Sequence, residues 1–146
     1  MSSPVLLAIE CSQRRGGVAL QAPSGDVHVV EMEPGARRDD VLQPAIESLF
    51  KETGLGPPDL DGCGCSIGPG GFTGLRITIA TARAMAMALR IPLYGIPSAA
   101  VAALSTTTPP GRVLVALASK GDSAWLTTME HPREGGWIGS GALVHS

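Results

Sequence analysis

Aromatic residues and long hydrophobic runs are scarce in this sequence. Only 3% of its 146 residues are Phe, Trp or Tyr, although 44% are hydrophobic. A core must therefore be built from Ala, Val, Leu, Ile and Met. No segment approaches the ~20 consecutive apolar residues that a membrane-spanning helix needs. The N-terminal segment also lacks the basic start of a signal peptide. We therefore expect a soluble, cytoplasmic protein with no membrane partner.

An excess of basic residues is absent too, and cysteine is rare. Eleven Lys and Arg stand against 13 Asp and Glu, giving a net charge of −2. Because a chain that neutralises many phosphates normally carries a basic surplus, tight nucleic-acid binding by this chain alone is not expected. Its three cysteines, Cys11, Cys63 and Cys65, are an odd number, which argues against a disulfide framework. No histidine stands at metal-ligand spacing from them, so we expect small buried hydrophobes and no metal site.

Strand and helix patterns alternate along the first hundred residues. A continuous apolar run at 4–12 is typical of a buried strand, and alternating valines and leucines around a turn at 24–26 indicate a hairpin. The remaining expected elements are a helix over 37–54, a strand over 61–68, a helix from the glycine-rich turn to residue 89, a strand over 91–97 and a helix over 98–105. This order predicts a mixed α/β fold.

Helix starts and a chain boundary can also be assigned. Polar side chains suited to capping are Asp39 or Asp40 for the first helix, Thr73 for the second and Ser98 for the third. The segment 106–111, TTTPPG, resembles a linker and places a boundary near Pro110. Beyond it we expect two strands, 112–118 and 123–129, joined by a turn at 119–122, and then a weakly patterned tail. We therefore divide the chain into lobes 1–108 and 109–146.

The glycine-rich turn that follows Ser66 invites comparison with phosphate-binding loops. A Walker loop requires a lysine after its last glycine, but Leu75 follows Gly74. The dinucleotide fingerprint fails as well, because its last glycine is replaced by Thr73. Amides at the helix start attract anions, whereas glycines also allow a tight turn without any ligand; both alternatives stay open. The candidate anion or nucleotide loop comprises Ser12, Gly70, Gly71, Thr73, Gly74 and Arg76.

The helix after this turn carries two apolar faces. Leu75, Ile79, Ala82, Ala86 and Leu89 fall on one side of a helical wheel and fit a core packed against a sheet. A second apolar face lies nearly opposite, where a surface helix of a monomer would be polar. We therefore expect a partner protein to cover it, together with the first helix. The predicted partner interface comprises Val41, Ala45, Ile77, Ala80, Ala84, Met87 and Ala88.

The segment GPGGFTGLR, preceded by VLLAIECS and followed by ATARAMAMALRIPLYGIPS, resembles the TsaB (YeaZ) family, formerly grouped with M22 glycoproteases. The resemblance covers about residues 4–105. It implies a ribonuclease H-like lobe of the actin/Hsp70/sugar-kinase superfamily with a mixed sheet, plus a truncated second lobe. Several positions depart from the family pattern and indicate a divergent, shortened member: Glu10 replaces Asp, Gly71 replaces Ser, Arg38-Asp39 replaces His-Ser, and Ala118-Ser119-Lys120 replaces Asp-Ala-Arg.

The resemblance also implies a function. The chain would be a non-catalytic scaffold in the complex that installs threonylcarbamoyl on adenosine 37 of tRNA. It would pair through its first-lobe helices with a TsaD-like catalytic paralogue, work with a TsaE-like ATPase, form a homodimer when alone and meet tRNA only through the complex. We expect no catalytic residues and no resident cofactor. The alternative is a nucleotide-binding enzyme of the sugar-kinase type, with Glu10 helping to hold magnesium and with ATP or ADP bound at a partner interface.

Overall fold

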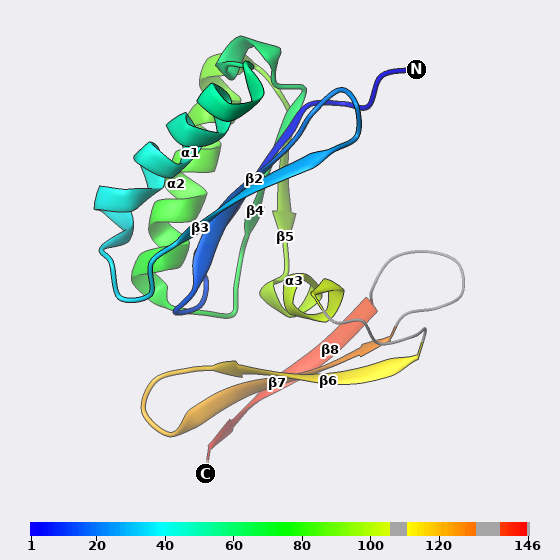
Figure 1. Ribbon diagram of the computed structural model, residues 1–146. Coiled ribbons are helices and arrows are strands. Elements are labelled where there is room, and N and C mark those ends of the chain that lie inside the picture. Colours follow the sequence, from blue (N-terminus) through cyan, green and yellow to red (C-terminus); the bar gives the residue numbers. More distant parts are fainter. Residues whose placement is uncertain (106–110, 131–137, 146) are drawn as a thin grey trace.

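The computed structural model describes residues 1–105, 111–130 and 138–145. Its elements alternate as the sequence patterns indicate (Figure 1). In chain order they are β1 (Leu6–Glu10), β2 (Gly16–Gln21), β3 (Val27–Met32), α1 (Arg38–Thr53), a 3₁₀ turn (Pro57–Asp59), β4 (Gly62–Ser66), α2 (Phe72–Leu89), β5 (Leu93–Ile96), α3 (Ser98–Leu104), β6 (Arg112–Ala118), β7 (Ser123–Glu130) and β8 (Ile138–His145).

A five-stranded mixed sheet organises the first hundred residues. Its strand order is β3-β2-β1-β4-β5. The β1–β2 and β2–β3 pairs are antiparallel, which confirms the predicted meander, whereas the β1–β4 and β4–β5 pairs are parallel. Each parallel pair needs a crossover connection, and α1 and α2 supply the two crossovers. The predicted mixed α/β architecture is therefore confirmed.

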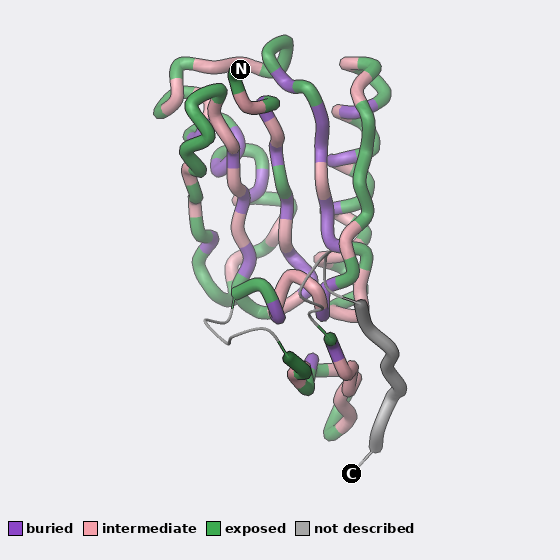
Figure 2. Tube along the Cα trace, turned by 90° about the vertical axis from the view of Figure 1, so that its right-hand side faces the viewer, coloured by how far each residue is buried: buried purple, intermediate pink, exposed green. Residues whose placement is uncertain are grey.

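The main core lies between this sheet and the two long helices. In Figure 1 both α1 and α2 lie on the same side of the sheet. Alternate strand residues point toward them, so fully buried positions alternate with partly buried or exposed ones along β1 and β2 (Figure 2). Leu7, Leu20 and Leu49 are fully buried there. All three cysteines are buried and free, as the sequence predicts.

The predicted helix caps are wrong. The residues that precede α1, α2 and α3 are Arg37, Gly71 and Pro97, and none makes a side-chain capping hydrogen bond. Asp39 and Asp40 lie within the first turn of α1, where their charges suit the helix dipole, and Asp39 also accepts a 2.8 Å hydrogen bond from Arg37. Thr73 and Ser98 also lie within their helices rather than before them, because α2 begins at Phe72 and α3 begins at Ser98 itself.

A second, three-stranded antiparallel sheet has the order β6-β7-β8. Helix α3 packs on it, with Ala99 and Ala103 against Leu117 and Met129. Strands β6 and β7 match the prediction, whereas β8 was missed because the glycines of the tail hide its strand pattern. The division at 108/109 falls in a segment outside the described residues and stays a prediction. No helix in the described ranges is long and apolar enough to cross a membrane.

Candidate functional site

The glycine-rich turn packs directly against the end of β1. A Cβ on Gly70 would lie 2.3 Å from the Ser12 carbonyl oxygen, and a Cβ on Gly74 would lie 2.1 Å from that of Cys11. Both distances are far shorter than real Cβ contacts, and the opposing atoms belong to the backbone. The Gly71 amide donates a 2.7 Å hydrogen bond to the Ser12 carbonyl. Two of the glycines are therefore needed for close chain packing, whatever else the turn does.

The residues of the candidate anion loop fall into two places. Ser12, Gly70, Gly71 and Gly74 meet where the turn touches the end of β1. Thr73 and Arg76 instead lie on the outer side of α2, where they line a shallow hollow with Ile77 and Ala80. The Arg76 guanidinium lies 5.2 Å from the centre of the Phe72 ring, at the start of α2. Whether Arg76 acts with the glycines on an anion stays a prediction.

Unpaired polar atoms gather near the carboxyl ends of the parallel strands. The Glu10 Oε1 atom accepts a 2.5 Å hydrogen bond from the Ser12 amide, whereas its Oε2 atom is buried without a partner. The hydroxyls of Ser12, Ser66 and Ser98 are also buried without hydrogen-bond partners. Carboxyl ends of parallel strands are the usual place for ligands in α/β sheets. Within the described residues, no three His, Cys, Asp or Glu side chains are grouped so that they could hold a metal ion.

The outer face of α2 is exposed and mostly apolar. We use this name for Phe72, Ile79, Ala80, Ala84, Met87 and Ala88. Phe72 is 73% exposed and Met87 is 68% exposed, both high values for large apolar side chains. Arg76 and Arg83 border a hollow on this face together with Ala80, Ala84 and Met87. Ala80, Ala84, Met87 and Ala88 belong to the interface that the sequence predicts, whereas Phe72 does not; a helical wheel extended by one turn toward the N-terminus includes it.

Two predicted faces need correction. Ala45 is only 6% exposed and belongs to the core, because α1 turns it with Leu42 and Leu49 toward the sheet. It therefore does not lie on an exposed interface. Ile79, assigned to the core face of α2, is 36% exposed, and the fully buried position is taken by Thr78 instead. The buried stripe of α2 is thus rotated slightly from the one that the wheel predicts.

The other two predicted interface residues are partly buried. Val41 and Ile77 both pack against the main core, so each offers only part of its side chain to the surface. Ile77 also lines a groove between α1 and α2, a hollow of about 480 Å³. The apolar floor of this groove is formed by Leu42, Ile46, Phe50, Ile77 and Met85. Asp39 and Glu47 stand among its lining residues and give its rim a negative charge.

Burial sets the chemistry of the thiols. It raises the pKa of Cys11, Cys63 and Cys65 above their ordinary value, because the thiolate would lose its hydration. The thiol form is therefore favoured, and a thiol in this state is a weak nucleophile. These residues fit a structural role, as the sequence predicts.

Comparisons with known proteins show which family this chain resembles in sequence. The family model described as TsaD, tRNA N6-adenosine threonylcarbamoyltransferase, matches residues 37–131. The tRNA threonylcarbamoyladenosine biosynthesis protein TsaB of Bacillus subtilis is 31% identical over 95 residues, which are 64% of this chain and 41% of that protein. The protein of the same name from Buchnera aphidicola is 27% identical over 103 residues, 69% of this chain and 48% of that protein. This chain thus spans less than half the length of these curated relatives.

A solved structure agrees over almost the whole chain. YeaZ from Pseudomonas aeruginosa superposes with a TM-score of 0.87 at 26% identity, covering 97% of this chain and 67% of that one. The superposition extends beyond the glycine-turn motif into the second sheet. With the mixed sheet order, it confirms the ribonuclease H-like fold of the actin/Hsp70/sugar-kinase superfamily. The family model, the relatives and the solved structure agree, and the chain therefore belongs to the TsaB (YeaZ) branch of the family that the TsaD model describes.

Proposed function

We propose that this chain is a non-catalytic subunit in the formation of threonylcarbamoyladenosine in tRNA, and that the outer face of α2 docks a TsaD-like catalytic paralogue. The observation that carries the proposal is the exposure of Phe72 and Met87 on the outer face of α2, where Arg76 and Arg83 border a hollow lined by Ala80 and Ala84. Alanines let a partner helix approach closely, and methionine adapts to an irregular surface. The names of the curated relatives support the pathway.

The groove between α1 and α2 would form the second part of this interface. Its floor is apolar, so a partner side chain could be buried there, and Asp39 and Glu47 at its rim favour a partner with basic side chains. Interfaces of this kind combine a buried apolar centre with a polar rim. The same surface is proposed to pair two copies of the chain when the paralogue is absent, and a TsaE-like ATPase would join the complex without using it.

Substitutions on α2 test the proposal. The chain is titrated with the purified TsaD-like protein from the same genome, followed by calorimetry. Ala84→Glu and Ala80→Arg place a charge at the centre of the face and are expected to weaken binding at least tenfold. Both positions are exposed, so the fold should survive. Ala116→Glu, at an exposed position of β6, is the matched control and should bind like the wild type.

Two results would count against this interface. Equal binding by Ala84→Glu and the wild type would show that the paralogue docks elsewhere. Light scattering of the chain alone gives the second check, because a dimer built on this face should become a monomer in both variants. An unchanged mass in a sample that was dimeric before mutation would rule out the pairing of two copies through α2.

The unpaired polar atoms favour a second candidate, nucleotide binding. Glu10 Oε2 and the hydroxyls of Ser12 and Ser66 suit a magnesium ion or the polar groups of a nucleotide. The turn offers phosphates less, because the Gly71 amide is already bonded and Arg76 lies over Phe72. Calorimetry with ATP and magnesium tests this candidate. Heat that disappears in Glu10→Gln would support it, and no heat at millimolar nucleotide would refute it for the isolated chain.

A further inference from the structure

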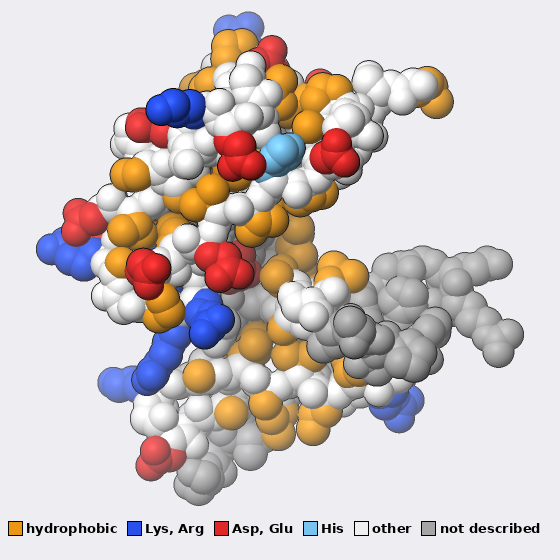
Figure 3. Space-filling model, viewed as in Figure 1, with side chains coloured by type: hydrophobic (Ala, Val, Ile, Leu, Met, Phe, Trp, Pro, Cys, Tyr) orange, Lys and Arg blue, Asp and Glu red, His pale blue; other side chains and the backbone are white. Residues whose placement is uncertain are grey.

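A basic hollow lies between the loop that joins β1 to β2 and the start of α1. Its volume is about 450 Å³, and it is lined by Arg14, Pro34, Gly35, Ala36 and Arg38. Two guanidinium groups and no carboxylate therefore belong to its lining. In Figure 3, several basic side chains gather at the lower left of the first sheet, where Figure 1 places the loop between β1 and β2. We call this feature the arginine hollow.

Backbone carbonyl groups hold Arg38 in place. Its Nη2 atom donates hydrogen bonds to the carbonyl oxygens of Gln13, at 3.4 Å, and of Arg14, and its Nη1 atom donates to that of Glu33, at 3.5 Å. These bonds use three of the five guanidinium N–H donors, so two donors have no partner within the described residues. Because carbonyl oxygens carry no net charge, Arg38 keeps its positive charge in a fixed position, which favours the binding of an anion.

The carboxylates at the start of α1 are paired with another arginine. Asp39 and Asp40 lie 2.8 Å and 3.7 Å from the guanidinium of Arg37. Among the residues that the structure describes, neither Arg14 nor Arg38 forms an ion pair. The two arginines of the hollow are therefore free to take a negative charge from outside the chain.

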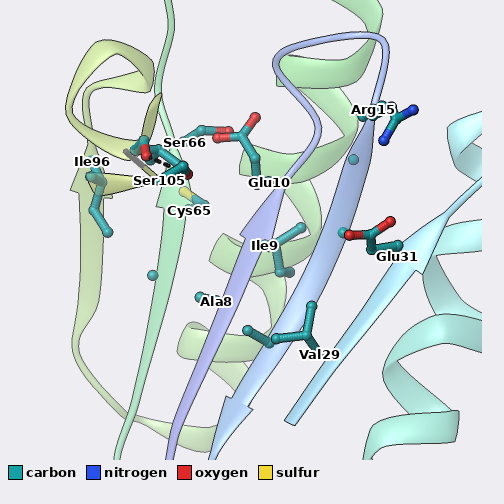
Figure 4. Close-up of a pocket in the computed structure, with 15 residues that line it drawn as sticks. Ala8, Ile9, Glu10, Arg15, Val29, Glu31, Cys65, Ser66, Ile96 and Ser105 are labelled. Atoms are coloured by element: carbon teal, nitrogen blue, oxygen red, sulfur yellow. Dashed lines mark hydrogen bonds between the residues drawn. The ribbon is translucent and has the colours of Figure 1, made fainter. Parts of the chain in front are cut away.

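The next arginine, Arg15, lies on a different surface. It lines the hollow on the sheet face opposite α1 and α2, together with Glu10 and Glu31 (Figure 4). Two carboxylates share that lining, so that surface does not favour anions. The anion site is therefore limited to Arg14 and Arg38.

The shape and lining of the arginine hollow favour a phosphate group over an acidic peptide. Gly35 has a φ of 86°, and a Cβ built on it would meet no atom within 4 Å, so the backbone there is open to approach. No large apolar side chain lines the hollow. A peptide partner normally gains its affinity from buried apolar anchors, whereas a nucleic-acid phosphate needs only charges and hydrogen-bond donors.

We propose that the arginine hollow binds a phosphate group of an RNA backbone and so gives this chain a direct contact with tRNA inside the complex. The inference rests on the proposed function, which supplies both the tRNA and the catalytic paralogue. Arg14 and Arg38 would hold the phosphate, which positions the RNA without reading its sequence. A contact with one phosphate is weak, in keeping with the net charge of −2 and with no tight nucleic-acid binding by the chain alone.

Binding of a tRNA transcript to the complex with the TsaD-like protein tests the proposal. The affinity is measured between about 50 and 200 mM salt. Arg14→Gln should weaken binding about five- to tenfold at the lower salt and should reduce the slope of log K against log salt by about 1. Arg14 is exposed, and Arg38 bonds its backbone carbonyl rather than its side chain, so the variant should fold. Arg14→Lys keeps the charge and should recover the slope.

The matched control is Lys51→Gln. It removes the same charge from the exposed last turn of α1, about 20 Å along the helix from Arg38, and should stay within twofold of the wild type. The proposal is overturned if Arg14→Gln binds tRNA like the wild type, or if Lys51→Gln loses as much affinity. It is also overturned if Arg14→Gln weakens the docking of the TsaD-like protein itself, because the hollow would then belong to the protein interface.

Two further measurements separate the remaining explanations. Inorganic phosphate is titrated into the chain alone; submillimolar binding that Arg14→Gln removes, with tRNA affinity unchanged, would assign the hollow to a free phosphate and overturn the RNA contact. The chain alone at low salt should rank the variants in the same order at lower affinity for tRNA. This arm tests the contact even without the paralogue, so failure to form the complex would count against the proposed function alone.

Discussion

Replacing Gly74 by alanine separates two opposite expectations. Gly74 lies in the first turn of α2, and alanine is favoured over glycine within a helix by about 1 kcal/mol. Helix propensity alone therefore predicts a more stable protein. In the structure, however, the new Cβ would lie 2.1 Å from the Cys11 carbonyl oxygen. About 1 Å of movement would be needed to restore a normal contact, and it must come from backbone on both sides.

The magnitude follows from the cost of overpacking. Forcing extra atoms into a packed site typically costs about 1–3 kcal/mol, and occasionally more. Because neither the helix start nor β1 can yield by rotating a side chain, we expect the upper part of this range. After the gain in helix propensity, the net loss in the free energy of unfolding should be about 2 kcal/mol. With a urea m-value of about 1–3 kcal/mol/M, the unfolding midpoint should fall by roughly 0.7–2 M.

The neighbouring Gly71 supplies the control. Its φ is −62°, and an added Cβ would be 3.7 Å from the Ser12 carbonyl oxygen, an ordinary contact. Gly71→Ala should therefore change stability by less than about 1 kcal/mol. Urea unfolding of the two variants is followed by far-ultraviolet circular dichroism. A Gly74→Ala protein that is as stable as the wild type would refute the close packing of the turn against β1.

Further predictions concern the core and the thiols. Leu49→Ala should lower the free energy of unfolding by about 2–5 kcal/mol, since Leu49 lies on the buried side of α1 and is fully buried. Leu114→Ala, at a 66% exposed position, should change it by less than about 0.5 kcal/mol in the same urea assay. The cysteines should react with a thiol reagent at pH 8 only after unfolding, and rapid labelling of the native protein would contradict their burial. Because burial raises their pKa in the folded state, stability should be constant at neutral pH and fall as the pH rises through the unfolded thiol value of about 8.5; a stability that rises there would contradict the assigned direction.

Much of the fold follows from local sequence patterns. The α1 stripe repeats at helical spacing and ends at Gly54, which adopts a left-handed φ of 69°. The hairpin of β2 and β3 alternates regularly around its turn. These signals are local, so a single sequence shows them. The hidden strand β8 shows the opposite case, because its glycines carry little strand preference and its position depends on pairing with β7.

The site was less accessible to sequence reasoning because it depends on tertiary contacts. Gly70 and Gly74 resemble a ligand loop, yet their need for glycine comes from Cys11 and Ser12 just after β1, about sixty residues earlier in the chain. Ala45 and Ala84 are both alanines within helices, so residue type alone does not distinguish them. In the structure Ala45 is buried in the core, whereas Ala84 faces solvent. The apolar hollow on the sheet face opposite α1 and α2 has no signature in the sequence, because Ala8, Ala19 and Gly64 come from three strands that only the sheet register brings together.

Cross-linking from the outer face of α2 tests the central claim most directly. A photoreactive amino acid is placed at Met87, which is 68% exposed, and in a parallel variant at Ala116 of the second sheet. Each protein is mixed with the TsaD-like protein of the same genome and irradiated. The proposed interface predicts a cross-linked heterodimer from position 87 and none from position 116. A cross-link from position 116 with none from position 87, in a mixture shown to contain the complex, would contradict it.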